Sequence, residues 1–487
     1  MPNQRLIETL RCFSEEERKR LVYFVESSYH NHKYNRPKTI QLLLHLLNKN
    51  LSDHDVLKQK EVLQALFFPE KPFVKKRKNA IDSLASDLFS LIKRFVLYEY
   101  EYNSENRKWK EQLMMIRFYR SNNLEHRFWQ AVQQFRRMLK KSQTRGEKHY
   151  QYVLELEEEV VTFQTTFNTY TGDSNLIRAH LALDKCYTIT KLEKAAVLIF
   201  QQKLGQIQTD DALLLNQLLI EVFSQYSEIQ TPLAKLYYLI IRLLQNSSDQ
   251  MIMEEFVDSV HAFKKQIPAE KYRNIMAFYR YFIGLRYQQE SSGPKLLQRL
   301  FTLYRQHLQD GYFAVDRAGR ILPGSLKLMT NIAIKVGDFN WAEQLLNLYG
   351  PRKITGTRFP MEAHSLCQAE VLFARELYTE SLDHIIYRNF EDINYSILAD
   401  ILLIKIYFVK DHNLLESRIS ALAQKVRRTK LTQAHKQQYL NFFKVMNLLC
   451  KYRWSKLPAE LSKLQEMIKG LVPLLEREWL NKMMKTI

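Results

Sequence analysis

Glycine and proline are scarce in this chain, with only 12 of each among 487 residues. A β-rich fold needs such residues at short intervals, because each strand has to be reversed by a tight turn. Leucine, lysine, glutamate and glutamine, which favour helices, are abundant instead. Apolar residues make up 46% of the chain, enough for a sizeable core. We therefore expect an all-α protein, built as several domains or as an elongated array.

Cysteine is rarer still, and the four cysteines lie far apart in the sequence. None of them belongs to a CxxC pair, which argues against a zinc ribbon or finger. Sparse, widely spaced cysteines are typical of proteins that work in a reducing cytosol. The opening residues, MPNQRLIETLRCF, contain no apolar signal segment. We expect a cytoplasmic protein.

Long apolar runs are missing as well. The most apolar window, Tyr395–Val409, is interrupted by Asp400 and Lys405. It is also too short to cross a bilayer, which takes about 20 residues of helix. We therefore expect no membrane insertion.

None of the common catalytic motifs is present. The sequence has no GxxxxGK[ST] phosphate loop, no GxSxG elbow, no HExxH zinc motif and no GxGxxG fingerprint. Glu157, Glu158 and Glu159 are consecutive carboxylates, but consecutive residues of a helix point in different directions. They would not converge as an acid–base pair. We predict a protein that is not an enzyme, with no catalytic residue and no cofactor.

Two histidines one residue apart, His30 and His32 in SSYHNHKYN, raise the question of a metal site. A catalytic zinc needs three protein ligands, and this pair supplies two. His45 and His54 are the nearest further candidates along the sequence. Because the pair directly follows an amphipathic helical segment, where histidine complements the helix dipole, we favour a helix end and predict no metal.

Positive charge is in excess, and most of the excess lies in the first third of the chain. The net charge is +20, and residues 1–150 carry 30 Lys and Arg against 17 Asp and Glu. Such a region suits nucleic acid, an anionic membrane surface or an acidic protein, or it simply keeps the protein in solution. The densest cluster is Lys75, Lys76, Arg77 and Lys78. Positive charge at the start of a helix opposes the helix dipole, and this local cost favours an external anion as partner. The cluster is therefore a candidate nucleic-acid contact, because binding to phosphates needs closely spaced cations.

Helical segments can be placed along the whole chain. The stretch SEEERKRLVYFVES begins with a capping box, in which Ser14 and Glu17 satisfy each other's main-chain N–H groups. We predict four regions: a basic helical bundle over residues 1–103, long connecting helices over 104–174, paired helices over 175–425, and capping helices over 426–487.

The clearest internal pattern is LMTNIAIKVGDFNWAEQLLNLYGP, residues 328–351. Ala333 and Ala342 are the small residues of two helices, and Gly337 lies in the turn between them. A weaker copy has Ser381 in place of Ala342, 39 positions later, and Glu376 in place of the turn glycine.

This pattern resembles a tetratricopeptide repeat, whose period is about 34 residues. The resemblance extends over residues 175–422 and is best in this first copy. It implies a tetratricopeptide-like α-solenoid of helix hairpins whose concave face binds peptides or proteins. The opening LIETLRCFSEEERKRLVYFVESSYHN, with LFFPEKPFVKKRKNAIDSLASDLFSLIKRF, also resembles the start of helical proteins of Bacteroidota, a resemblance that implies no activity.

Two sets of residues are candidates for partner binding. In the segment YRNIMAFYRYFIGLRY, Arg273, Arg280 and Tyr287 share one stripe of a helix and suit a groove that meets carboxylate or phosphate. The second set lies in two loops, DGYFAVDRAGRILPGS and YGPRKITGTRFP, which connect successive helix pairs. In a solenoid, equivalent connections emerge on the same edge. The basic residues of these loops are Arg317, Arg320, Arg352, Lys353 and Arg358.

Taken together, the sequence predicts a non-enzymatic protein-binding or scaffolding module with a protein or acidic-peptide partner. The alternative is a nucleic-acid-binding regulator that joins a basic helical head to a repeat domain. The sequence leaves the partner's identity and the oligomeric state open.

Overall fold

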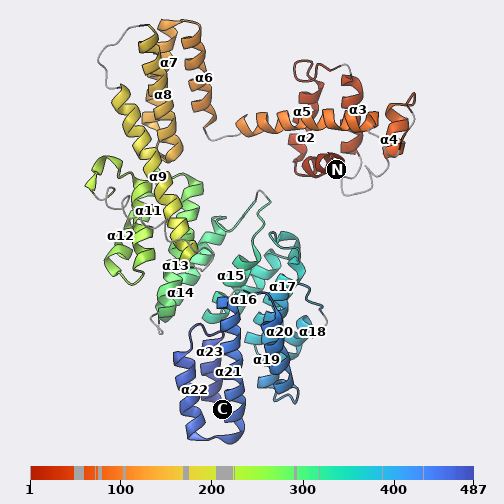
Figure 1. Cartoon of the computed structure of the whole chain (residues 1–487), viewed down its shortest axis with the longest axis vertical. Coiled ribbons are helices and arrows are strands. Elements are labelled where there is room, and N and C mark those ends of the chain that lie inside the picture. Colours follow the sequence, from red (N-terminus) through yellow and green to blue (C-terminus); the bar gives the residue numbers. More distant parts are fainter. Residues whose placement is uncertain are drawn as a thin grey trace. The chain divides into compact units, whose positions relative to one another are not determined.

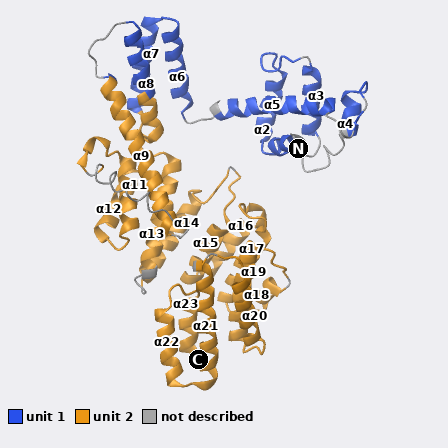
Figure 2. Ribbon diagram, viewed as in Figure 1, with its two compact units in different colours: residues 1–141, 155–175 blue, residues 142–154, 176–487 orange. Residues whose placement is uncertain are grey.

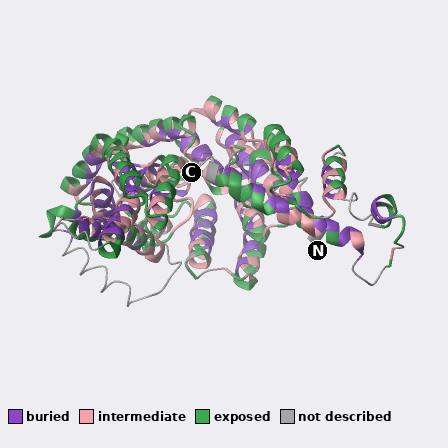
Figure 3. Ribbon diagram, turned by 90° about the horizontal axis from the view of Figure 1, so that it is seen from above, coloured by how far each residue is buried: buried purple, intermediate pink, exposed green. Residues whose placement is uncertain are grey.

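The computed structural model describes residues 2–33, 35–48, 60–71, 73–74, 79–102, 106–167, 175–203, 223, 225–289, 293–316, 318–386, 388–431 and 433–487. Over these ranges it contains 22 α-helices and no β-strand, which confirms the all-α prediction (Figure 1). Among the described helices, none is long and apolar enough to cross a membrane. Most helices contain both buried and exposed residues, as expected of amphipathic helices (Figure 3).

The chain forms two compact units (Figure 2). Unit 1 comprises residues 1–141 and 155–175, and unit 2 comprises residues 142–154 and 176–487.

The first five helices of unit 1 share one hydrophobic core. They are α1 (Pro2–Arg11), α2 (Glu15–Glu26), α3 (Arg36–Asn48), α4 (Lys60–Phe67) and α5 (Ala80–Tyr102). Helix α5 packs against each of the other four. Its core residues recur every three or four positions, from Ile81 and Leu84 to Ile92 and Phe95, so one apolar face is buried along most of its length.

Both ends of α2 are stabilised by side chains close to it in the sequence. The Ser14 Oγ accepts the Glu17 N–H at 3.3 Å, and Glu17 Oε2 accepts the Ser14 N–H at 2.8 Å, which confirms the capping box. After the helix ends at Glu26, the His30 ring stacks on Phe24 with centroids 4.0 Å apart. His30 therefore packs against the end of the helix that precedes it.

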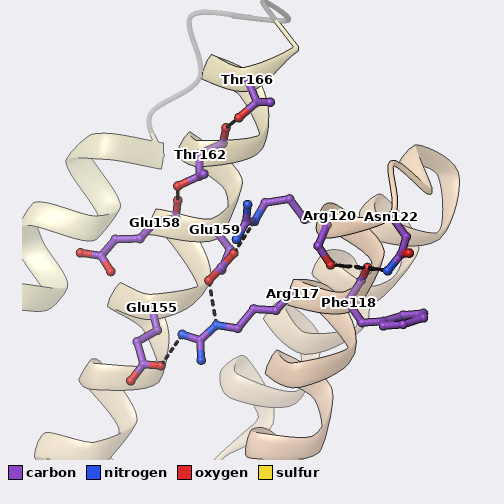
Figure 4. Close-up of polar contacts among 10 residues, drawn as sticks. Arg117, Phe118, Arg120, Asn122, Glu155, Glu158, Glu159, Thr162 and Thr166 are labelled. Atoms are coloured by element: carbon purple, nitrogen blue, oxygen red, sulfur yellow. Dashed lines mark hydrogen bonds and ion pairs between the residues drawn. The ribbon is translucent and has the colours of Figure 1, made fainter.

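The remaining helices of unit 1 are α6 (Arg107–Ser121), α7 (Glu125–Lys141) and α8 (Glu147–Thr166), whose first residues belong to unit 2. Arginines of α6 hold α8 through its carboxylates (Figure 4). Glu159 accepts the Nε groups of Arg117 and Arg120 at 2.8 and 2.7 Å, and Glu155 accepts Arg117 Nη2 at 3.0 Å.

A second, more buried ion pair joins α7 to α8. Arg136 donates from Nε and Nη2 to the two oxygens of Glu157, at 3.0 and 2.6 Å. The Glu157 side chain is only 3% exposed. Glu158, by contrast, points away from the arginines of α6 (Figure 4). The three consecutive glutamates thus face three directions, as helical geometry requires.

Unit 2 is a succession of packed helices with three short 3₁₀ turns. The helices are α9 (Asn175–Lys203), α11 (Pro232–Gln245), α12 (Gln250–Phe263), α13 (Ala269–Gln289), α14 (Pro294–Gln309), α15 (Pro323–Val336), α16 (Phe339–Leu348), α17 (Pro360–Ala374), α18 (Tyr378–Ile386), α19 (Ile393–Val409), α20 (Leu415–Arg428), α21 (Gln433–Ser455), α22 (Pro458–Gly470) and α23 (Arg477–Thr486). From α11 to α22, consecutive helices pack as pairs. Each pair from α13 to α20 also packs on the helix that begins the next pair.

Helix α19 lies between two cores. Ile397, Ile401 and Ile404 point into the core shared with α20 and α21. Ala399 and Leu402 point into the core shared with α17 and α18. The apolar window Tyr395–Val409 is therefore a helix that neighbouring helices bury on opposite sides.

Three of the turns between paired helices share one backbone conformation. Gly337, at φ +84°, ends α15, and the N–H of the next residue donates to the Ala333 carbonyl at 3.0 Å. This confirms the predicted turn at Gly337. Glu376 and Asp411 adopt the same left-handed conformation, at φ +64° and +53°, with equivalent hydrogen bonds at 3.0 and 2.9 Å. A helix ending of this kind satisfies carbonyls that the helix leaves unpaired.

Replacing Arg136 by methionine should lower the apparent free energy of unfolding by about 3 kcal/mol, because it leaves a buried carboxylate without its arginine. Urea denaturation of the full chain measures this change. Arg137→Met, at an exposed position of the same helix, is the matched control and should change the value by less than about 0.5 kcal/mol. Equal effects of the two substitutions would contradict the assignment.

Replacing Glu376 by glycine should stabilise the chain by about 0.5–1 kcal/mol, since glycine adopts a positive φ without the cost that a Cβ imposes. The converse substitution, Gly337→Ala, should destabilise by a similar amount, because the added Cβ meets open space and only the backbone is strained. Thermal unfolding measured for both variants tests the shared conformation, and a destabilised Glu376→Gly variant would refute it.

Candidate protein-interaction surface

Two loops of unit 2 lie side by side. Residues 310–322 connect α14 to α15, and residues 349–359 connect α16 to α17. The Ile321 N–H donates to the Lys353 carbonyl and the Thr355 N–H to the Ile321 carbonyl, each at 3.0 Å, which makes an isolated parallel bridge of Ile321 with Ile354. Both isoleucines are buried and anchor the bridge. The structure thus brings together the two loops that the sequence singled out.

The bridge gathers exposed cations, which we call the basic edge: Arg320, Arg352, Lys353 and Arg358. Arg320 pairs with Asp316, its Nε lying 2.6 Å from Oδ2. Over the residues that the structure describes, no carboxylate lies within ion-pair distance of the other three. Arg317, the fifth predicted member, lies outside the described residues. The edge is therefore positively charged on balance.

Asp316 organises the first of the two loops. Its Oδ1 accepts the N–H groups of Ala318 and Arg320, both at 3.1 Å, in addition to the Arg320 side chain on Oδ2. These bonds, led by the one from the Arg320 N–H, hold the pKa of Asp316 below its ordinary value. Gly319, at φ +70°, supplies the left-handed residue that closes the turn. The position of Arg320 is thus set by bonds within its own loop.

Arg280 supports the same loop from helix α13. Its guanidinium lies over the Phe313 ring, 4.4 Å from the centroid, and its Nη1 donates to His307 Nδ1 at 2.7 Å. Burial lowers the pKa of Arg280. About two turns earlier along the stripe, Arg273 Nη1 donates to the Ala314 carbonyl at 3.5 Å. Both arginines therefore contact the base of the loop, where their partners are internal.

His307 is held neutral in this arrangement. It is buried, with 2% of its surface exposed, and its Nδ1 accepts the Arg280 hydrogen bond. Burial, followed by the positive charges of Arg280 and Lys264, lowers the pKa of His307 to about 4. Protonation of the ring would remove the acceptor and place a second cation beside Arg280.

Tyr287, the third residue of the predicted stripe, has different neighbours. Its hydroxyl donates to Glu478 Oε1 at 3.3 Å, and the Lys335 ammonium lies 5.2 Å from its ring centroid. The three residues that spacing places on one stripe of the helix therefore have different partners in the tertiary structure. Its arginines contact a loop, and its tyrosine contacts a carboxylate of α23.

A cavity of about 460 Å³ between α12, α13 and α14 has no counterpart in the sequence analysis. Its apolar residues are Met253, Val257, Ile283 and Leu296, and its polar residues are Gln250, Glu254, Asp258, Arg286 and Arg299. Arg286 is 9% exposed and donates to the Gln250 side chain and, at 3.0 Å, to the Asp249 carbonyl. These residues come from three helices, so no local motif could reveal the cavity.

The predicted nucleic-acid contact, Lys75, Lys76, Arg77 and Lys78, lies outside the described residues. Over the described part of the chain, no three His, Cys, Asp or Glu side chains are grouped so that they could hold a metal ion. Comparison of the chain with protein-family models, with curated proteins and with solved structures gave no match.

Acidification should destabilise the chain through His307. Its pKa is about 4 in the folded protein and about 6.5 when unfolded, so the stabilisation is complete above pH 6.5 and is lost as the pH falls towards 4. The loss should reach about 3 kcal/mol. Urea denaturation across this range should show a shallower decline for His307→Gln, which keeps an acceptor for Arg280. The exposed His261→Gln is the control, and parallel declines for all three proteins would contradict the assignment.

Proposed function

We propose that this chain is a non-enzymatic protein-binding or scaffolding module, and that its basic edge binds an acidic segment of a protein partner. The observation that carries the proposal is the main-chain bridge of Ile321 with Ile354. It holds cations from two successive connections at one edge of unit 2, with their side chains exposed.

The proposal includes a tetratricopeptide-like arrangement of the helix pairs into a solenoid, with an N-terminal bundle over residues 1–103. Two observations support the solenoid. Each pair from α13 to α20 packs on the helix that begins the next pair. The left-handed turn also recurs at Gly337, Glu376 and Asp411, although only the first is glycine. Ala342 and Ser381, the small residues of adjacent pairs, are both fully buried.

An acidic segment suits this edge for chemical reasons. Arg352 and Arg358 present planar guanidinium groups, which bind carboxylates through paired hydrogen bonds. Because the side chains are exposed, their contribution lies in steering and orientation more than in raw affinity. Helical repeats supply the rest of such an interface through their apolar and aromatic surface. The expected complex is therefore sensitive to salt.

The alternative function is that of a regulator that binds nucleic acid. Its predicted contact, residues 75–78, lies outside the described part of the chain, and no described feature favours nucleic acid over an acidic protein. The experiment below separates the two.

A fluorescein-labelled polyglutamate peptide and a single-stranded DNA of equal charge are the probes for a fluorescence anisotropy titration of the full chain. We expect the peptide to bind, with an affinity that falls as salt is added. The double variant Arg320→Glu/Arg352→Glu should weaken peptide binding by about tenfold or more, because each reversal replaces attraction by repulsion.

The matched control is Arg427→Glu/Arg428→Glu, which makes the same change of charge at exposed positions of α20. Equal weakening by both double variants would mean that the edge is not the site. Preferential binding of the DNA, unaffected by the edge variant, would replace this proposal by the regulator.

A further inference from the structure

The cavity of about 460 Å³ between α12, α13 and α14 is built by two successive helix pairs. Helix α12 packs on α11, and α14 packs on α13, so the cavity lies where the second helix of one pair faces both helices of the next. All of its residues belong to unit 2. Its volume is within the range of about 300–1,000 Å³ that is typical of sites for small ligands.

One wall of the cavity is a single face of α12. Its members recur at helical spacing and are Gln250, Met253, Glu254, Val257 and Asp258. Met253 is buried and Val257 is half-buried, whereas the three polar residues are exposed. This wall is therefore apolar at its deeper positions and polar where it meets solvent.

The facing wall contributes further apolar groups. They are Ile283 from α13 and Leu296 from α14. Ile283 and Met253 also belong to the largest hydrophobic core of unit 2, so close packing fixes the inner surface of the cavity. An apolar surface of this kind suits an aliphatic chain, because burial removes the chain from water.

Arg286 is the buried polar group of the cavity. It is 9% exposed, and a guanidinium carries five N–H donors. Its Nη1 donates to the Gln250 side-chain oxygen, and its Nη2 donates to the Asp249 carbonyl at 3.0 Å. Its Nε has no hydrogen-bond partner within the described part of the chain. Both of its acceptors are neutral, so neither offsets the positive charge.

The charge of Arg286 is also unmatched by an ion pair. Among the residues that the structure describes, no carboxylate lies within ion-pair distance of its guanidinium. The Asp249 carboxylate instead caps α12, where its Oδ1 accepts the Ile252 N–H at 3.0 Å. A buried cation without an anionic partner is unfavourable. Arg286 therefore favours an external anion, and a carboxylate matches the fork of a guanidinium.

A second cation, Arg299, lines the same cavity from α14. Its side chain is exposed, and its Nη2 donates to the hydroxyl of the buried Tyr279 at 2.8 Å. This bond holds the guanidinium against α13. No described carboxylate lies within ion-pair distance of Arg299 either. The cavity thus contains one buried and one exposed arginine, neither of which is neutralised by a direct ion pair.

Two carboxylates of α12 limit the charge that a ligand can carry. Glu254 and Asp258 are exposed members of the lining, and Glu254 Oε1 accepts the Gln250 amide at 2.6 Å. They balance the two arginines, so the lining has no net charge. A multiply charged anion such as a phosphate ester would be repelled by these carboxylates. A single carboxylate can lie beside the buried arginine at lower cost.

We propose that this cavity binds a small monocarboxylate with an aliphatic chain. The ligand's carboxylate pairs with Arg286, and its chain lies against Met253, Val257 and Leu296. The buried guanidinium then gains the anion that the described chain does not supply. This inference concerns a small-molecule site, goes beyond the proposed interaction at the basic edge and does not depend on it.

Isothermal titration calorimetry of the full chain with octanoate tests the proposal. Octanamide, which has the same chain without a charge, and octyl phosphate, which carries more charge, should each bind at least about tenfold more weakly. Arg286→Met removes the cation but keeps an aliphatic side chain, and it should weaken octanoate binding by about tenfold or more. Arg305→Met, at an exposed position of α14 outside the lining, is the control of equal charge and should bind as the wild type does.

Val257→Phe is the second variant, because it fills the cavity and leaves both arginines in place. It should also weaken octanoate binding by about tenfold or more. Circular dichroism establishes that each variant is folded, and Val257→Phe carries the test if Arg286→Met is not. Absence of octanoate binding to the wild type would overturn the proposal, as would an unchanged affinity in a folded variant. Equal binding of octanamide, or tighter binding of octyl phosphate, would overturn it too. Failure at the basic edge leaves this result untouched, since its probes and variants do not involve the cavity.

Discussion

The burial of the helix that begins each pair is the constraint on which unit 2 depends. Helix α19 shows this most clearly, because Ile397, Ile401 and Ile404 enter one core, whereas the core on the other side receives Ala399, Leu402 and Ile406. Its start is also held in place, since the Glu362 carboxylate accepts the N–H groups of Glu391 and Asp392 at 2.9 and 3.1 Å. A helix packed on opposite sides cannot rotate without exposing apolar surface. The position of Lys405 at the edge of that packing follows from this burial.

The two charged surfaces of unit 2 differ in their physical environment. The cations of the basic edge are exposed and fixed by main-chain bonds between loops. Lys405 lies in a mostly buried setting beside aromatic rings, with a carboxylate at 2.7 Å. Exposed charges act over a distance and are screened by salt, whereas a half-buried charge discriminates strongly between a carboxylate and any other group. The exposed cations suit the proposed acidic partner, whereas the Lys405 pair fixes one segment of the chain against another.

Predictions from sequence succeeded where neighbours along the chain decide the outcome. The capping box of Ser14 with Glu17 and the turn at Gly337 depend on a few adjacent residues, and both were predicted. The turn at Glu376 was harder, because glutamate disfavours a positive φ and the surrounding helices impose it. The domain limits and the solenoid remain predictions. The cavity beside Arg286 had no signal, since its lining comes from three helices.

The sequence by itself determined the helical class, through scarce turn residues and apolar residues at helical spacing, and it placed basic residues in two loops. Tertiary structure decided what those residues face. Arg280 and Tyr287 share one helix and one stripe, yet one lies over Phe313 and the other meets Glu478. Lys405 of α19 and Glu476, the residue before α23, form a pair although they lie far apart in the sequence. Periodicity reports which side of a helix is apolar, but the partner of a side chain depends on which distant segment is packed there.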